Sequence, residues 1–217
     1  MATPRSKTTA PPRHAAAQLT DTRERILRVA AEAWHARSFD GIGTAELCRR
    51  AEVHKGSFFH FFASKDELLL AVLARYAEQI GPHLRGGAFA RDVAPLARFE
   101  RFFADTAATA RRELAAEGCM RGCPIGNLVL ELSTRSAAVQ QAAARVFDEM
   151  QAVFKEALDE AVATGELAST ADTAGLATTV LSLLQGLAVI GKAYAGVDRL
   201  HPVVAHVMAL LRDGARG

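Results

Sequence analysis

The 217-residue sequence is poor in aromatic residues, which make up 6% of it, and it contains three cysteines. No run of about 18 consecutive apolar residues, the length needed to span a bilayer, is evident. Pro, Arg and Lys occupy the N-terminus, where a secretion signal needs an apolar stretch. We therefore expect a cytoplasmic protein without a membrane segment, in which Cys48, Cys119 and Cys123 are free thiols rather than a disulfide framework.

Signals for β-strands are also scarce. Apolar residues recur at helical spacing rather than in alternation, while Ala, Leu, Glu and Arg fill most long stretches. With 50% apolar residues, the chain can build a hydrophobic core. We therefore predict an all-α fold, with helices near residues 20–38, 44–51, 55–62, 64–80, 93–117, 127–132, 136–163, 172–194 and 201–212.

Capping and breaker residues set some of these boundaries. Ser64 and Glu67 have the spacing of a capping box, which indicates the start of the fourth helix. Gly81-Pro82 is expected to stop or kink that helix, because proline lacks an amide donor. Residues 118–126 are rich in Gly, Cys and Pro, and we predict an unusual loop there.

The charge is small in sum but uneven along the chain. The net charge is +2, yet residues 1–76 are net basic and the remainder is slightly acidic. Residues 1–19 contain three prolines together with Arg5, Lys7 and Arg13 and no acidic residue, so we predict a disordered basic arm. Such an arm is either a featureless tail or a segment that follows DNA phosphates or a minor groove.

The motifs of helical enzymes are missing. The sequence has no H-E-x-x-H, no paired E-x-x-H and no phosphate-binding loop after a strand. Cys119 and Cys123 lack a convincing second pair of metal ligands, since His201 and His206 are distant in sequence. We therefore predict that the chain is not an enzyme and holds no cofactor or metal; a purely protein-binding helical bundle stays open as an alternative.

Two short helices joined by a tight turn occur at 44–62, and this pattern suits a helix-turn-helix that places its second helix in a DNA major groove. The string T-A-E-L-C-R-R-A-E-V-H-K-G-S-F-F-H-F-F-A-S-K-D-E-L, residues 44–68, resembles the DNA-binding domain of the TetR family of transcriptional regulators. The resemblance implies a helix-turn-helix domain at 20–66, followed by a helical ligand-sensing and dimerisation domain at 67–217.

The residues expected to contact double-stranded operator DNA are Thr44, Lys55, Gly56, Ser57, Phe59, His60 and Lys65. Phe58 and Phe62 are expected to pack inward. The sequence departs from the family pattern at two positions. Glu52 stands where glycine usually makes the turn, which should strain the backbone. Phe59 stands where a tyrosine usually contacts phosphate, which removes one hydrogen bond.

The run R-G-C-P-I-G-N-L-V-L-E-L, residues 121–132, together with Gly186 and Lys192, resembles the NemR/AcuR-like branch of the family. That branch senses reactive electrophiles, oxidants or acrylate-like molecules. Cys123 lies in a bend before a helix, where free amides and Arg121 could stabilise a thiolate. The resemblance brings Lys192 close to Cys123, and Cys119 could act as a resolving thiol.

Two alternatives to a sensor thiol stay open. Cys119 and Cys123 could be small buried apolar residues, as Cys48 is expected to be. A non-covalent inducer could instead occupy an apolar pocket with a few polar groups. The residues expected to line that pocket are Phe99, Phe102, Phe103, Met150, Phe154, Asn127, Glu131 and Gln185.

The last two long helices are expected to pair with a second copy in a four-helix interface, as in the resembled family. The expected contact residues are Leu176, Val180, Leu183, Leu187, Val203, Val207 and Leu211. The sequence thus predicts a homodimeric repressor that a small-molecule inducer, or modification of a cysteine, releases from a palindromic operator. An activator with the same fold and a non-covalent ligand is the alternative.

Overall fold

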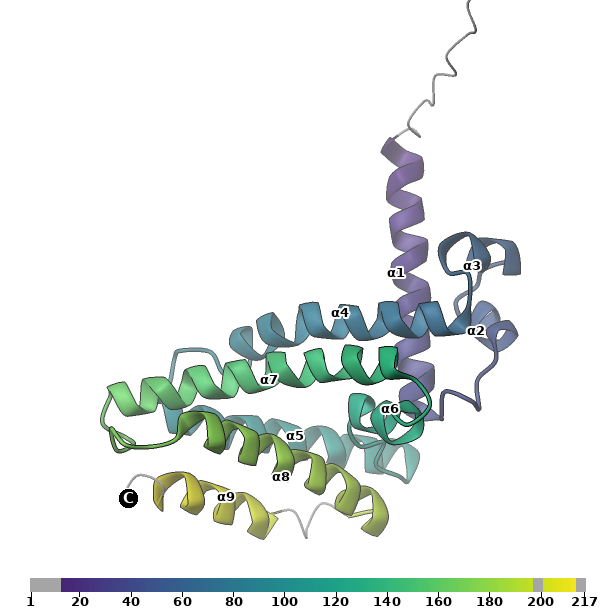
Figure 1. The fold of residues 1–217 in the computed structure, drawn as a ribbon. Helices are drawn as coiled ribbons and strands as arrows, with labels where there is room; N and C mark the ends of the chain where they lie inside the picture. The colour runs from purple at the N-terminus through teal and green to yellow at the C-terminus, as the bar shows by residue number, and fades with distance from the viewer. Residues whose placement is uncertain (1–12, 197–200, 214–217) are drawn as a thin grey trace, which may run out of the picture.

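A computed structural model describes residues 13–196 and 201–213, and these form nine α-helices and no strand (Figure 1). The helices are α1 (Arg13–Ala36), α2 (Thr44–Arg50), α3 (Lys55–Phe61), α4 (Lys65–Gly86), α5 (Pro95–Glu117), α6 (Pro124–Leu132), α7 (Ala137–Ala163), α8 (Thr173–Tyr194) and α9 (His201–Asp213). The all-α prediction is confirmed.

The N-terminal helix is longer than predicted. α1 begins at Arg13 rather than near Thr20, so the second part of the predicted disordered arm is helical, while residues 1–12 lie outside the described residues. The run H-A-A-A-Q-L has few residues that oppose a helix, and this explains the extension. In Figure 1, α1 stands across one end of the molecule, beside α2 and α3.

α1 to α3 share a hydrophobic core with α4, α6 and the start of α7. Ile26, Ala30 and Trp34 recur at a spacing of four residues along α1 and are buried. The same cluster contains Phe58 of α3 and Leu128 of α6. Because one core joins these elements, a shift of α6 is felt by the helix-turn-helix unit, by which we mean α1–α3.

α4 runs through Pro82 to Gly86, so the helix does not stop near residue 80, which was one of the two predicted outcomes. Gly81 is buried, and a Cβ on it would lie 2.8 Å from the Arg85 guanidinium and 3.3 Å from a Glu149 carboxylate oxygen of α7. This close packing of α4 on α7 offsets the amide hydrogen bond that Pro82 cannot donate. The capping box at its start is confirmed, since Ser64 accepts from the Glu67 amide at 3.0 Å.

A second core lies between α5, α7, α8 and α9. Phe99 and Phe154 are fully buried in it, with ring centroids 5.9 Å apart, and Phe89 lies 5.0 Å from Phe99. Such aromatic contacts add to the free energy gained from apolar burial. This core holds the C-terminal helices around α7, which packs mainly on α4 and α8.

α8 is long and apolar enough, by length and composition, to cross a membrane, and no other described helix is. Threonines, serines and glycines interrupt its apolar residues, so the search for an unbroken run overlooked it. Length and composition alone are weak evidence for a membrane span, because core helices of soluble proteins pass the same test.

The residues predicted to form the dimer contact point mostly into the protomer. Val180, Val207 and Leu211 are at most 2% exposed, and the other four are half-buried against the second core. The regular apolar stripe on which the prediction rests is thus largely used by the core of a single chain, and the position of a dimer contact stays a prediction. The exposed large apolar residues of these two helices are Val189, Ile190, Tyr194 and Leu210.

Candidate functional site

The turn between α2 and α3 has the strain that the sequence predicts. Glu52 has φ +52°, in the left-handed region that glycine adopts without cost. α2 begins after Gly43, and Thr44, its first residue, is half-buried. The hydroxyl of Thr44 does not cap the helix, because Gly43 occupies the N-cap position.

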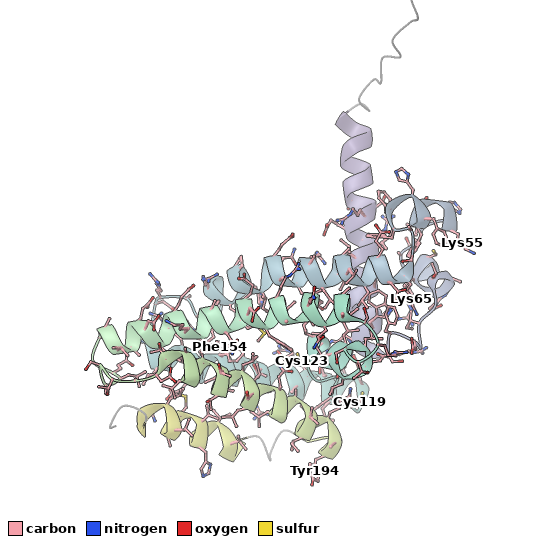
Figure 2. The ribbon with its side chains drawn as sticks, in the orientation of Figure 1. Lys55, Lys65, Cys119, Cys123, Phe154 and Tyr194 are labelled. Carbon is pink, nitrogen blue, oxygen red and sulfur yellow. The ribbon has the colours of Figure 1, made fainter. Side chains whose placement is uncertain are left out.

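α3 presents one outward face made of predicted contact residues. Phe58 is fully buried, and Phe62, directly after the helix, is 2% exposed, as predicted. Lys55, Gly56, Phe59 and His60 are exposed and Ser57 is half-buried. Figure 2 shows Lys55 at the outer side of α3, away from the rest of the molecule.

Two details of this face favour a partner that approaches the backbone closely. A side chain at position 56 would have open space: among the described residues outside its own turn, no atom lies within 4 Å of a Cβ built on Gly56. Packing within the protein therefore does not require glycine at this position. Phe59 is 45% exposed, and the Lys55 ammonium lies 5.8 Å from its ring centroid. The ring thus holds a cation near the start of α3.

Lys65 has a different environment from the one predicted. Its ammonium donates to the Phe39 carbonyl at 3.0 Å and the Ile42 carbonyl at 3.3 Å, and it lies 4.0 Å from the centroid of the Phe39 ring. The side chain therefore fastens the loop between α1 and α2. Only its backbone amide, in the first turn of α4, stays suited to a phosphate.

Two arginines of α2 neutralise a neighbouring carboxylate. Arg49 donates to Glu46 at 2.7 and 2.9 Å, and Arg50 donates at 2.7 Å. Hydrogen bonds from Arg49 and then Arg50 lower the pKa of Glu46 to about 2. α2 thus keeps a net positive charge of one from these three residues, on the surface next to α3.

Cys123 lies at a junction between two cavities. It is the N-cap residue of α6, and its Sγ accepts a hydrogen bond from the Gly126 amide at 3.3 Å. It is half-buried and lines both a cavity of about 480 Å³ between α5 and α8 and one of about 660 Å³ between α6 and α8. Cys119 is exposed and is not among the described residues that line either cavity.

The structure brings together some predicted sensing residues. Lys192, Asn127 and Cys123 line the 660 Å³ cavity, where the Lys192 ammonium donates to the Asn127 side-chain oxygen at 3.2 Å. Phe103 and Gln185 line the 480 Å³ cavity. The phenol of Tyr76 lies near the Cys123 thiol, and burial, with a smaller contribution from Cys123, raises the pKa of that phenol.

Besides Cys119, three predicted sensing residues lie outside both cavities. Phe99 and Phe154 belong to the second core and line neither of these cavities, because they point between α5, α7 and α8 into a closed aromatic cluster. Arg121 turns to Glu117, with a hydrogen bond of 2.8 Å, so its guanidinium is paired with that carboxylate. Cys48 is a buried core residue, as predicted, and burial raises the pKa of its thiol.

The Cys123 segment is tied directly to the helix-turn-helix unit. His35 of α1 contacts the Gly122 carbonyl through Nε2 at 2.9 Å, and Gly122 has φ +77°, which lets the loop present that carbonyl. The Glu131 carboxylate of α6 accepts from the Phe39 amide at 2.9 Å and the Asp40 amide at 3.0 Å. These partners lie 87 to 92 residues apart, so no local sequence signal could have paired them.

Within the described residues, no group of three or more His, Cys, Asp or Glu side chains is placed to hold a metal ion.

Comparison with known proteins agrees with this geometry. AcuR of Cereibacter sphaeroides, a transcriptional regulator, is 28% identical over 176 residues, which cover 81% of this chain and 78% of AcuR. The transcriptional repressor NemR of Escherichia coli is 45% identical over 56 residues, or 26% of this chain and 28% of NemR. These relatives support the predicted NemR/AcuR-like branch.

Solved structures show the same fold. The reduced form of Escherichia coli NemR has a TM-score of 0.74 and 26% identity, covering 86% of this chain and 95% of that one. A TetR regulatory protein from Rhodobacter sphaeroides has a TM-score of 0.75 and 26% identity, covering 87% and 97%. The tetR family of bacterial regulatory proteins matches residues 26–72, and the tetracyclin repressor-like C-terminal domain matches residues 95–207. The chain therefore belongs to the TetR family of transcriptional regulators.

Proposed function

We propose that the protein is a homodimeric repressor whose α3 helices enter successive major grooves of a palindromic operator in the cytoplasm. The observation that carries the proposal is the outward face of α3, where Lys55, Gly56, Ser57, Phe59 and His60 are available to DNA while Phe58 anchors the helix from inside. Lys55 and His60 suit phosphate oxygens, and Ser57 suits a base edge.

We further propose that Cys123 is the sensor. Its thiolate adds to the aldehyde carbon of methylglyoxal or the ring of a quinone, forming a C–S bond while the π electrons move to oxygen, which takes up a proton. Hypochlorous acid, itself the oxidant, would instead transfer its OH group to the thiolate sulfur, which forms a sulfenic acid as the O–Cl bond breaks and chloride leaves. The half-exposed position of Cys123 between two cavities gives such reagents a route to the sulfur.

The contacts of α6 supply a path from sensor to DNA. An adduct on Cys123 displaces the N-terminal cap of α6, and Glu131 and the Gly122 carbonyl transmit that shift to the loop at residues 39–40 and to α1. A small rotation of the two α1–α3 units changes the separation of the paired α3 helices, so that they no longer fit one DNA face.

Release from operator DNA tests the sensing proposal. Fluorescence anisotropy with labelled operator is expected to show that methylglyoxal, quinones or hypochlorite release the wild-type protein and the Cys48→Ser variant, but not Cys123→Ser. The Cys119→Ser variant tests whether Cys119 is a resolving thiol. If it is, this variant should alter the response to hypochlorite and leave the response to quinones unchanged. Full retention of response in Cys123→Ser would contradict the proposal.

A non-covalent inducer is the second candidate, because the 480 Å³ cavity is large enough for a small ligand and mostly apolar. It would use the same α6 path to the DNA. A compound without an electrophilic centre that releases both wild type and Cys123→Ser from DNA would favour this version.

A further inference from the structure

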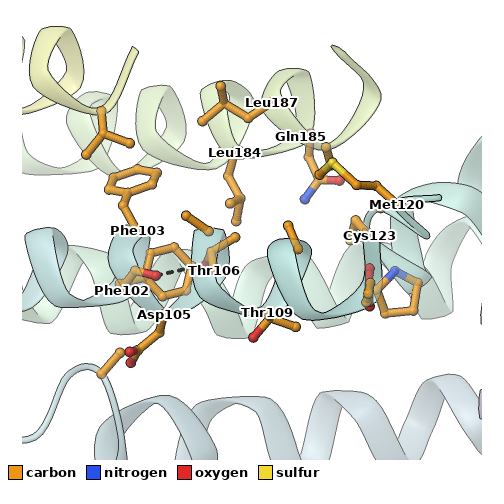
Figure 3. Close-up of a pocket in the computed structure, with 18 of the residues that line it drawn as sticks. Phe102, Phe103, Asp105, Thr106, Thr109, Met120, Cys123, Leu184, Gln185 and Leu187 are labelled. Atoms are coloured by element: carbon orange, nitrogen blue, oxygen red, sulfur yellow. Dashed lines mark hydrogen bonds between the residues drawn. The ribbon is translucent and has the colours of Figure 1, made fainter. Parts of the chain in front are cut away.

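The 480 Å³ cavity has an uneven charge. Its apolar lining comes from α4, α5, α8, α9, the loop before α6 and the first residue of α6. Figure 3 shows lining side chains such as Leu184 and Leu187 facing the space between α5 and α8. Among the described lining residues, the ionisable groups besides Cys123 are His83, Asp105 and Glu113, and there is no lysine or arginine. The chain therefore offers an acidic boundary to an apolar space.

Three cations beside this cavity already have hydrogen-bond partners, and one of them, Arg112, donates to the hydroxyl of the lining residue Thr109 at 2.9 Å. The Arg121 guanidinium is bound to Glu117, and the Lys192 ammonium donates to Asn127 on the other cavity. Glu113 accepts a hydrogen bond from the Arg121 backbone amide at 3.1 Å, which orients the carboxylate. A negatively charged ligand would therefore lose water beside the half-buried Glu113 carboxylate and near the exposed Asp105 carboxylate, and no lysine or arginine is among the described lining residues to compensate.

Gln185 lines the cavity and carries a hydrogen-bond donor that lacks an acceptor in the described part of the chain. Its side-chain nitrogen is buried and has no hydrogen-bond partner among the described residues. Its side-chain oxygen would lie 2.6 Å from a Cβ on residue 126, so the amide is packed closely against α6. Figure 3 shows Gln185 on α8 at the same end of the cavity as Met120 and Cys123. An oxygen acceptor on a ligand would satisfy this donor.

We propose that this cavity binds neutral or cationic ligands with an apolar body, that Gln185 donates to a carbonyl-type oxygen of the neutral ones, and that carboxylates are excluded. A cation is stabilised by Asp105 and Glu113 and by the aromatic faces of Phe102 and Phe103. The inference rests on the proposed function, because it names the ligand class of the same sensing domain. Among electrophiles, the cavity therefore selects uncharged carbonyl compounds over acrylate-like anions.

Three unreactive compounds with one apolar body test this selectivity: 3-phenylpropanamide, 3-phenylpropylamine and 3-phenylpropanoate. In isothermal titration calorimetry with the full-length protein at neutral pH, the amide and the amine are expected to bind at least about 10-fold more tightly than the carboxylate. Using unreactive compounds separates the selectivity of the cavity from any chemistry at Cys123.

Two variants assign the two contacts. Gln185→Leu is expected to weaken binding of the amide by about 10-fold and to change binding of the amine little, because an ammonium group offers no acceptor to Gln185. Asp105→Asn should weaken binding of the amine and leave binding of the amide unchanged, while Asp105→Lys should improve binding of the carboxylate. Asp148→Asn, an exposed acid on α7 outside the cavity, is the matched control and should change none of the three. Thermal melting checks that each variant is folded.

Binding of the carboxylate as tight as that of the amide, or no binding of any of the three up to their solubility limits, would overturn the inference. Loss of amide and amine binding by equal factors in Gln185→Leu would overturn the role of Gln185. DNA binding by the same samples is measured in parallel. Absence of DNA binding with intact ligand selectivity contradicts the proposed function alone, and intact DNA binding without selectivity contradicts this inference alone.

Discussion

At the scale of single residues, the two lysines at the ends of the α3 region have opposite surroundings. Lys55 is exposed beside Phe59, whereas the Lys65 ammonium is half-buried and bound to the carbonyls of Phe39 and Ile42. The same side-chain type therefore serves DNA contact at one position and loop attachment at the other.

Replacing each lysine with methionine separates these roles. Lys65→Met should lower the free energy of unfolding by about 1–2 kcal/mol, since two hydrogen bonds from a charged donor are lost. Lys55→Met should leave the stability nearly unchanged, but it should weaken DNA binding and reduce the slope of log affinity against log salt concentration by about 1. Urea unfolding and anisotropy titrations measure both quantities. Equal stability losses in the two variants would contradict the assignment.

Glu52 offers a test of backbone strain. Glu52→Gly should raise the free energy of unfolding by about 0.5–1 kcal/mol, because relief of the positive φ exceeds the added freedom of the unfolded chain. Glu52→Ala is the control, since alanine keeps the strain. If the glycine variant melts at or below the temperature of the alanine variant, the strain is not significant.

At the scale of elements, α6 connects the sensing half of the molecule to the helix-turn-helix unit. Its N-terminus is capped by Cys123, its buried side contributes to the core shared with α1–α3, and Glu131 binds the loop before α2. One helix of nine residues thus contacts both the proposed sensor and the proposed DNA-binding elements.

Removal of the Glu131 carboxylate should uncouple the two halves. In Glu131→Ala, inducer binding is expected to stay close to that of wild type, while the ratio of DNA affinities without and with inducer falls toward one. Glu131→Gln keeps one acceptor oxygen and should retain part of the ratio. Lys155→Ala, which breaks an exposed ion pair on α7, serves as the control. A normal ratio in Glu131→Ala would exclude this path.

The sequence predicted elements well where a local signal exists. Ser64, Ser136 and Asp172 each accept a hydrogen bond as N-cap residues, close to the predicted starts of α4, α7 and α8. Pro82 does not end α4, because tertiary packing overrides this local helix breaker. The partners of Lys65 and Glu131 depend on how distant segments meet, and neither spacing nor composition predicts them. Glu117, the partner of Arg121, lies only four residues away, a spacing that the sequence does show.

At the scale of the whole molecule, the exposed apolar residues of α8 and α9 indicate where a second copy packs. Val189 is 53%, Ile190 47% and Leu210 46% exposed, and dimers are typical of this family. Burial of this face in a dimer would also account for the strongly apolar composition of α8.

A charge within this face should block dimer formation. Ile190→Asp is expected to sediment mainly as a monomer and to lose binding to a palindromic operator, because a desolvated carboxylate without a partner opposes association. Val93→Asp, at an exposed apolar position before α5, is the control and should stay dimeric. A dimeric Ile190→Asp would place the interface elsewhere.

Paired α3 helices are proposed to bind a specific operator, and selection from a random pool of DNA duplexes followed by sequencing tests this binding. We expect enrichment of one inverted repeat with half-site centres about one helical turn, roughly 34 Å, or a multiple of it apart. Enrichment should be lost in Ile190→Asp and reduced in Lys55→Met. A pool bound without sequence preference, or a single half-site enriched without its repeat, would contradict the account.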